Sequence, residues 1–145
     1  MKEKRGLYHV LAEESPTMRL AEPEATYLVR QVRQGVSMEE FFALQELLGL
    51  SEEALADTLG MSRTTMHRRK KSGTLESVES ERVLRVTRMF VRAEEVFESR
   101  AAAREWLRAP ALALQGESPL QYLDTEIGAR EVENILGRLE HGVFF

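Results

Sequence analysis

Apolar side chains recur every three or four positions over most of this chain, which predicts helices rather than strands. The clearest stripes precede Gly35 and Gly49, fill residues 77–97, and return near the end of the chain at Val132 and Leu139. No alternation typical of a strand occurs after residue 24. The pattern therefore predicts an all-α fold.

Serine and glycine mark the expected ends of these helices. Ser37 is a predicted N-cap, with Glu40 completing a capping box, and Ser51 and Ser62 are predicted to cap the next two helices. Gly60 separates those two helices. The last helices are expected to begin at Ser118-Pro119 and at Asp124-Thr125 and to end at Gly142.

The first 24 residues carry the weakest helical signal. Glu13-Glu14-Ser15-Pro16 and Glu22-Pro23 are typical of turns or linkers. Leu7-Tyr8-His9-Val10-Leu11 fits either a short strand or an arm docked on the domain. We therefore expect residues 1–24 to form an N-terminal arm, either disordered or docked.

Residues 52–69 have the pattern of a helix-turn-helix. Leu55, Leu59, Met61 and Met66 are spaced to meet between two short helices, and Gly60 lies where the chain must turn sharply. In such a unit the second helix lies in the major groove of DNA. The predicted DNA contacts are Ser62, Arg63, Thr64, His67, Arg68, Arg69, Lys70 and Lys71, of which Arg69 and Lys70 are expected to touch phosphates.

The distribution of charge supports this prediction although the chain as a whole is acidic. The net charge is −4, with 20 basic and 24 acidic side chains. Residues 62–73 contain five basic side chains and no acidic one, whereas residues 111–145 contain two basic and six acidic side chains. Because the local field decides whether a phosphate backbone is attracted, the basic middle of the chain is compatible with DNA binding.

Several classes of function lack support in the sequence. The chain has no cysteine, and its three histidines have no ligand spacing, so we expect no disulfide and no metal site. No glycine-rich phosphate loop or nucleophile elbow occurs, so we expect neither an enzyme nor a cofactor. No apolar run reaches the roughly 18 residues of a membrane span, and we expect a cytoplasmic protein.

The C-terminal third closely resembles a known family. The stretches from Trp106 to Leu120 and from Leu123 to Phe144, with the terminal Glu-His-Gly-Val-Phe run, are similar to the C-terminal domain of Xre/MbcA/ParS antitoxins. The helix-turn-helix and residues 82–97 resemble the N-terminal domain of the same family. The resemblance implies three parts: the arm (1–24), a helix-turn-helix domain (25–98) and a toxin-binding domain (99–145).

The resemblance also implies partners. Antitoxins of this kind neutralise a RES-domain toxin, which consumes NAD or transfers ADP-ribose, by covering its active site, and they bind operator DNA to repress their own operon. We expect a homodimer, because operators of helix-turn-helix proteins are usually two-fold. The expected toxin contacts are Glu133, Leu136, Arg138, Leu139, His141, Gly142, Val143, Phe144 and Phe145.

Two alternatives stay open at this stage, and two further expectations concern Trp106 and the arginines of residues 82–92. The chain fits a stand-alone transcription regulator or an adaptor that never touches DNA, and the two terminal phenylalanines fit a toxin pocket or the chain's own core. Arg82, Arg85, Arg88 and Arg92 follow one helix face, and we expect them to be solvated rather than to contact phosphate or another subunit. Trp106 is expected to be a core residue.

Overall fold

The computed structural model describes residues 6–13 and 22–142, and it confirms the all-α prediction. Within these ranges there is no β-strand, and Ser37 and Thr74 form an isolated antiparallel bridge. The helices are α1 (Leu7–Glu13), α2 (Glu22–Gln34), α3 (Met38–Leu48), α4 (Glu52–Thr58), α5 (Arg63–Ser72), α6 (Ser77–Phe97), α7 (Arg100–Arg108), α8 (Pro119–Tyr122) and α9 (Glu126–Glu140), with a 3-10 turn at Leu112–Leu114.

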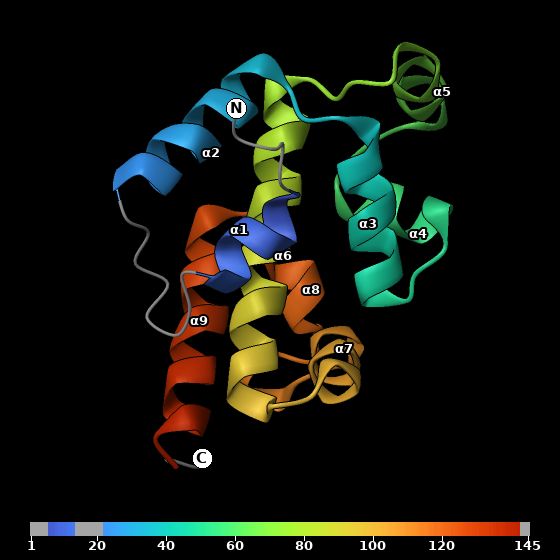
Figure 1. The fold of residues 1–145 in the computed structure, drawn as a ribbon. Coiled ribbons are helices and arrows are strands. Elements are labelled where there is room, and N and C mark those ends of the chain that lie inside the picture. Colours follow the sequence, from blue (N-terminus) through green and yellow to red (C-terminus); the bar gives the residue numbers. More distant parts are fainter. Residues whose placement is uncertain (1–5, 14–21, 143–145) are drawn as a thin grey trace.

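Helix α6 is the centre of the molecule. It has 21 residues, which makes it about 32 Å long, and it packs against α1, α2, α3, α7 and α9 (Figure 1). Its apolar face, including Val83 and Phe90 at 0% exposure, belongs to a core cluster that draws on all of these helices. The predicted helix-turn-helix and toxin-binding parts therefore share one continuous core along α6.

Arginines of α7 also join these two parts. Arg104 Nε donates to the Leu47 carbonyl at 2.9 Å, and Arg108 Nη1 donates to the Gly49 carbonyl at 3.1 Å. Both carbonyls lie at the end of α3, where no further helical turn supplies donors. The α7 side chains thus cap a helix of the other part, a connection that the sequence did not predict.

Most of the predicted caps are confirmed. The side chains of Ser51, Ser62, Ser118 and Thr125 each accept a hydrogen bond from a backbone amide of the helix that they precede. Ser37 also caps α3, but its hydroxyl accepts from Glu39, while the Glu40 amide bonds the Ser37 carbonyl. The predicted Ser37–Glu40 capping box is therefore wrong, because the Ser37 hydroxyl bonds the amide of Glu39 rather than the amide of Glu40.

The Glu40 carboxylate instead supports α1. It accepts a hydrogen bond from the Leu7 amide at 2.7 Å, and Leu7, Val10 and Leu11 are buried against the domain. These three positions share one face of a helix but opposite faces of a strand, so the strand alternative is wrong and α1 is a docked helix. The prediction of a disordered arm does not hold for residues 6–13.

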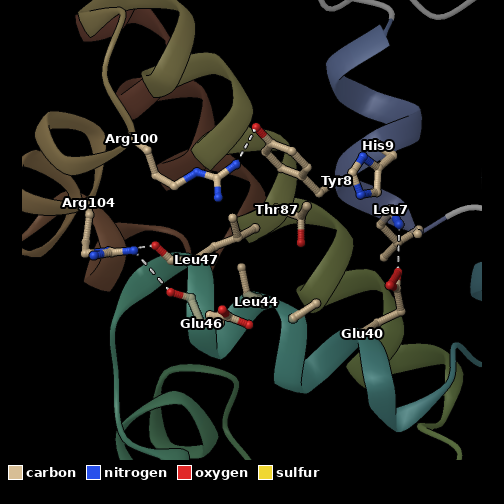
Figure 2. Close-up of a pocket in the computed structure, with 12 residues that line it drawn as sticks. Leu7, Tyr8, His9, Glu40, Leu44, Glu46, Leu47, Thr87, Arg100 and Arg104 are labelled. Carbon is tan, nitrogen blue, oxygen red and sulfur yellow. Dashed lines mark hydrogen bonds between the residues drawn. The ribbon is translucent and has the colours of Figure 1, made fainter.

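A cleft of about 290 Å³ lies beside α1, between α3 and the start of α7. Figure 2 shows Arg100 reaching across it, where the guanidinium donates to the Tyr8 hydroxyl at 3.1 Å. The Tyr8 hydroxyl in turn donates to Glu94 on α6, and burial is the main cause that raises the pKa of Tyr8, followed by the bond to Glu94. Two polar side chains that line the cleft, Glu40 and Arg100, thus hold α1 in place.

None of the helices in the described part of the chain combines the length and the apolarity needed to cross a membrane.

Candidate functional site

Helices α4 and α5 form the predicted helix-turn-helix core. Leu55, Leu59, Met61 and Met66 are all buried, with exposed fractions of 0% to 6%. The Met61 amide donates to the Ala56 carbonyl at 2.8 Å, which closes the turn between the helices. The apolar spacing in the sequence therefore identified the contacts that fix α5 relative to α4.

The turn itself depends on Gly60 and on an arginine of α6. Gly60 has a φ of +70°, a backbone conformation that costs glycine little. Arg82 Nη1 donates to the Leu59 carbonyl at 2.8 Å, and a Cβ added at Gly60 would lie 2.8 Å from that nitrogen. Arg82 thus braces the turn that orients α5.

The outward face of α5 is polar and basic. Ser62, Arg63, Thr64, His67, Arg68 and Lys71 are all exposed, as is Lys70, which pairs with Glu52 of α4 at 3.2 Å. Figure 1 shows α5 at the edge of the molecule, away from the core. A helix that presents arginines and short hydroxyl side chains in this way is equipped to bond guanines and phosphates.

The groove between α4 and α5 carries both signs of charge. It has a volume of about 430 Å³, and Arg63, His67 and Lys70 line one side. Glu52 and Asp57 of α4 line the other side. Since these carboxylates would repel a phosphate backbone, the basic field is strongest on the outer face of α5.

Arg69 differs from the other predicted DNA contacts. Its side chain is only 12% exposed, and its guanidinium donates to the two carboxylate oxygens of Glu79 at 2.6 and 3.0 Å. Glu76 lies 3.3 Å from the same group. Burial raises the pKa of Glu79, but the bonds from Arg69 and the Glu76 amide outweigh it and hold the pKa below its ordinary 4.5. The structure thus places Arg69 between α5 and α6, facing inward.

Helix α9 lies along α6 and presents its other face to solvent. Glu133, Arg138, His141 and Gly142 are exposed and Leu139 is half-buried, so these five predicted toxin contacts reach the surface. Leu136 departs from the prediction, because at 0% exposure it belongs to the chain's own core. The predicted contacts Val143, Phe144 and Phe145 lie outside the described residues.

The arginine stripe of α6 holds α9 at both ends. Near the start of α9, Arg85 donates to the Leu123 carbonyl at 3.1 Å, and Arg85 and Arg88 lie 3.6 and 3.7 Å from the Glu126 carboxylate. At the far end, Arg92 donates to both oxygens of Glu140. The expectation of a solvated stripe was wrong for Arg82, Arg85 and Arg92, because carbonyls and carboxylates from distant parts of the chain meet these side chains.

The last turn of α9 and helix α5 lie at opposite ends of the molecule (Figure 1). This separation allows one surface to be occupied without covering the other. Trp106, which was expected to be a core residue, is only half-buried, and it packs against Phe97 at the edge of the core with ring centroids 5.6 Å apart. Among the described residues, no group of three or more histidine and acidic side chains is placed to hold a metal ion.

Two protein families match this chain. Residues 28–88 match the family described as the antitoxin Xre-like helix-turn-helix domain. Residues 92–142 match the family described as the antitoxin Xre/MbcA/ParS C-terminal toxin-binding domain. The two matches meet within α6, the helix that both parts of the core share.

Individual relatives agree with these matches. The chain is 33% identical to "Antitoxin Xre" of Yersinia enterocolitica over 121 residues, which is 82% of each chain. It is 30% identical to "Antitoxin Xre" of Pseudomonas putida over 106 residues, covering 70% of this chain and 67% of that one. It is 24% identical to the "Prs ADP-ribosylating antitoxin" of Sphingobium sp. over 123 residues, covering 78% and 77%.

Proposed function

The chain belongs to the Xre family of antitoxins, and from that premise we propose that it neutralises a RES-type toxin and represses its own operon. The observation that carries the proposal is the presence, on one continuous core, of an exposed basic helix α5 and, at the other end, a C-terminal part that matches a toxin-binding domain. The name of the Sphingobium relative connects that protein with ADP-ribosylation, the chemistry expected of a RES-type toxin.

Neutralisation is proposed to use the end of α9 and the residues after it. Glu133, Arg138, Leu139, His141 and Gly142 would contact the toxin, together with Val143, Phe144 and Phe145, which supply apolar area for a cleft. The pair of Arg92 with Glu140 supports this role, because a helix end held in place loses less conformational entropy on binding. The antitoxin itself performs no chemistry in this scheme, and no cofactor is needed.

DNA binding is proposed to use the outward face of α5. Ser62, Arg63, Thr64, His67 and Arg68 would contact bases or phosphates in the major groove, and Lys70 and Lys71 would contact phosphates. Arg69 is assigned a positioning role because Glu79 already occupies its guanidinium. One recognition helix buries little surface, so we propose that a homodimer reads a two-fold operator in the cytoplasm.

Copurification tests the toxin half of this proposal. The chain is expressed with the product of the adjacent gene, and NAD consumption by that product is measured with and without the antitoxin. We expect a stable complex in which NAD consumption stops. A variant that lacks residues 143–145 should bind more weakly and leave residual activity. A neighbour that neither binds nor consumes NAD would favour the stand-alone regulator.

A mobility-shift assay with the upstream region of the same gene tests the DNA half. The control is the variant with Arg63→Ala and Arg68→Ala, which changes only exposed side chains of α5. We expect it to lose the shift while it still neutralises the toxin. If wild-type protein produced no shift, with or without the toxin, the result would contradict DNA binding and favour the adaptor that never touches DNA.

A further inference from the structure

The loop between α7 and α8 presents a leucine almost completely to solvent. Leu112 has an exposed fraction of 99%, the highest among the large apolar side chains that are exposed in the described part of the chain. Leu114, two residues later, is 1% exposed and anchors the loop in the core. Leu112 is therefore exposed at a defined position, because Leu114 anchors the loop that carries it.

The backbone of this loop is fixed by its own hydrogen bonds. The Ala111 amide donates to the Glu117 carbonyl at 2.9 Å, and the Ala111 carbonyl accepts from the amides of Leu114 and Gly116 at 3.1 and 3.0 Å. A reciprocal capping box between Ser118 and Gln121 fixes the start of α8 directly after the loop. Leu112 is thus displayed on a preorganised backbone, which lowers the entropic cost of using it in a contact.

The loop segment around Leu112 lacks charged side chains. Residues 109–116 contain no Asp, Glu, Lys or Arg, although these residues make up 30% of the chain. Ala109, Pro110 and Ala113 are exposed together with Leu112, which makes a small apolar surface. Single exposed apolar side chains are ordinary, but depletion of charge around one is typical of the centre of a protein interface.

We propose that this surface, residues 109–116 with Leu112 at its tip, is a second contact with the toxin, in addition to the end of α9. The proposal rests on the proposed function. The toxin is the occupant that the observations favour, because the surface lies inside residues 92–142, the part matched to a toxin-binding domain, and directly precedes α8 in the chain. DNA is disfavoured because the surface carries no cation to meet a phosphate. The complementary feature on the toxin is an apolar pocket that admits one aliphatic side chain.

Binding measurements on full-length variants test this proposal. The protein encoded beside this chain's gene is titrated with wild type, Leu112→Ala, Leu112→Glu and the control Val78→Glu, whose residue is 59% exposed at the start of α6, outside the toxin-binding match. Leu112→Ala should raise the Kd for the toxin about tenfold, and Leu112→Glu should raise it further. Val78→Glu should leave that Kd within about twofold, and unfolding curves should match for all four proteins because both sites are exposed.

A probe at the same site gives an independent readout. Because the chain has no cysteine, Leu112→Cys creates a unique thiol for an environment-sensitive dye, and Val78→Cys is its matched control. Toxin should shift the emission of the dye at residue 112 to shorter wavelength and leave the control unchanged.

Three outcomes would overturn the proposal. If wild type binds the toxin and Leu112→Glu binds it equally well, this inference alone is overturned. A change of oligomeric state in Leu112→Glu with an unchanged Kd overturns it in favour of a second copy of the chain. Failure of wild type to bind the toxin overturns the proposed function as well.

Discussion

Arg92 of α6 and Glu140 of α9, which are 48 residues apart, form a bidentate ion pair with both N–O distances at 2.8 Å. The Arg92 guanidinium also lies 3.5 Å from Glu95 of its own helix, and both carboxylate oxygens of Glu95 are buried without a hydrogen-bond partner. The bond from Arg92 is the main cause that holds the pKa of Glu140 below its ordinary value. One arginine thus fixes the end of the proposed toxin-binding helix and compensates a buried carboxylate.

Removing Arg92 is expected to cost more than removing its partner. Arg92→Met leaves the Glu95 carboxylate without this counter-charge and should lower the free energy of unfolding by about 1–3 kcal/mol. Glu140→Gln removes only a partly exposed charge and should cost about 0.5 kcal/mol. Urea unfolding of both variants measures the difference. Equal losses would contradict the role assigned to Glu95.

Replacing Gly60, in the turn before α5, should destabilise the protein more than replacing Gly73, which follows α5. Gly60→Ala and Gly73→Ala both place a side chain at positive φ, which costs about 1–2 kcal/mol. Gly60→Ala should cost about 1 kcal/mol more, because the new methyl displaces Arg82 from the Leu59 carbonyl, whereas Gly73 has open space. The excess should vanish in an Arg82→Met background, as measured by a double-mutant cycle of unfolding free energies.

Two glycines of α9 should respond in opposite directions. A Cβ at Gly128 would lie 1.9 Å from the Tyr122 carbonyl oxygen, so Gly128→Ala must separate α8 from α9 and should destabilise the protein by about 2–3 kcal/mol. At Gly137, no atom of the described residues outside the neighbouring backbone of α9 lies within 4 Å of the same position, and Gly137→Ala should stabilise the protein by about 0.5–1 kcal/mol. Thermal unfolding separates them: a lower melting temperature for Gly137→Ala would contradict the open space described there.

Acid should weaken the contact between α5 and α6. The pKa of Glu79 is below its ordinary 4.5 in the folded chain, so folding favours the charged carboxylate. The resulting stability is complete above the unfolded pKa and is lost as the pH falls through the lower, folded pKa. The stability difference between wild type and Glu79→Gln should therefore be full at pH 7 and shrink below pH 4.5. Urea unfolding of both proteins at several pH values measures this difference, and a difference that does not change with pH would contradict the role assigned to Glu79.

Salt should distinguish the exposed cations of α5 from Arg69. Each phosphate contact contributes about 0.9 to the slope of log affinity against log salt concentration. If Lys71 contacts a phosphate, Lys71→Ala should reduce the slope by about that amount. Arg69→Met should leave the slope nearly unchanged while it lowers stability, because its cation pairs with Glu79. Titrations of operator DNA at several salt concentrations provide both values, and a reduced slope for Arg69→Met would place its cation on DNA.

The sequence predicted the helix-turn-helix well because its determinants are local. These determinants act over a few residues, where helix geometry decides which side chains contact each other. They are the serine that caps α5, the glycine turn and the apolar spacing of Leu55, Leu59 and Met66. The same reasoning failed for Glu40, whose carboxylate bonds the amide of Leu7 in a helix more than thirty residues earlier. A one-dimensional pattern contains no information about that neighbour.

By itself, the amino-acid sequence determined that this protein is helical, where several of its helices begin, and that it has an antitoxin's two modules in order. Only the tertiary structure decided the roles of the long cationic side chains. Arg69 faces Glu79, Arg82 braces a turn and Arg92 holds α9, although along the sequence each looks like a surface charge. The reason is physical: helix signals depend on neighbours a few residues apart, whereas the partner of a flexible charged side chain is set by which distant elements pack beside it.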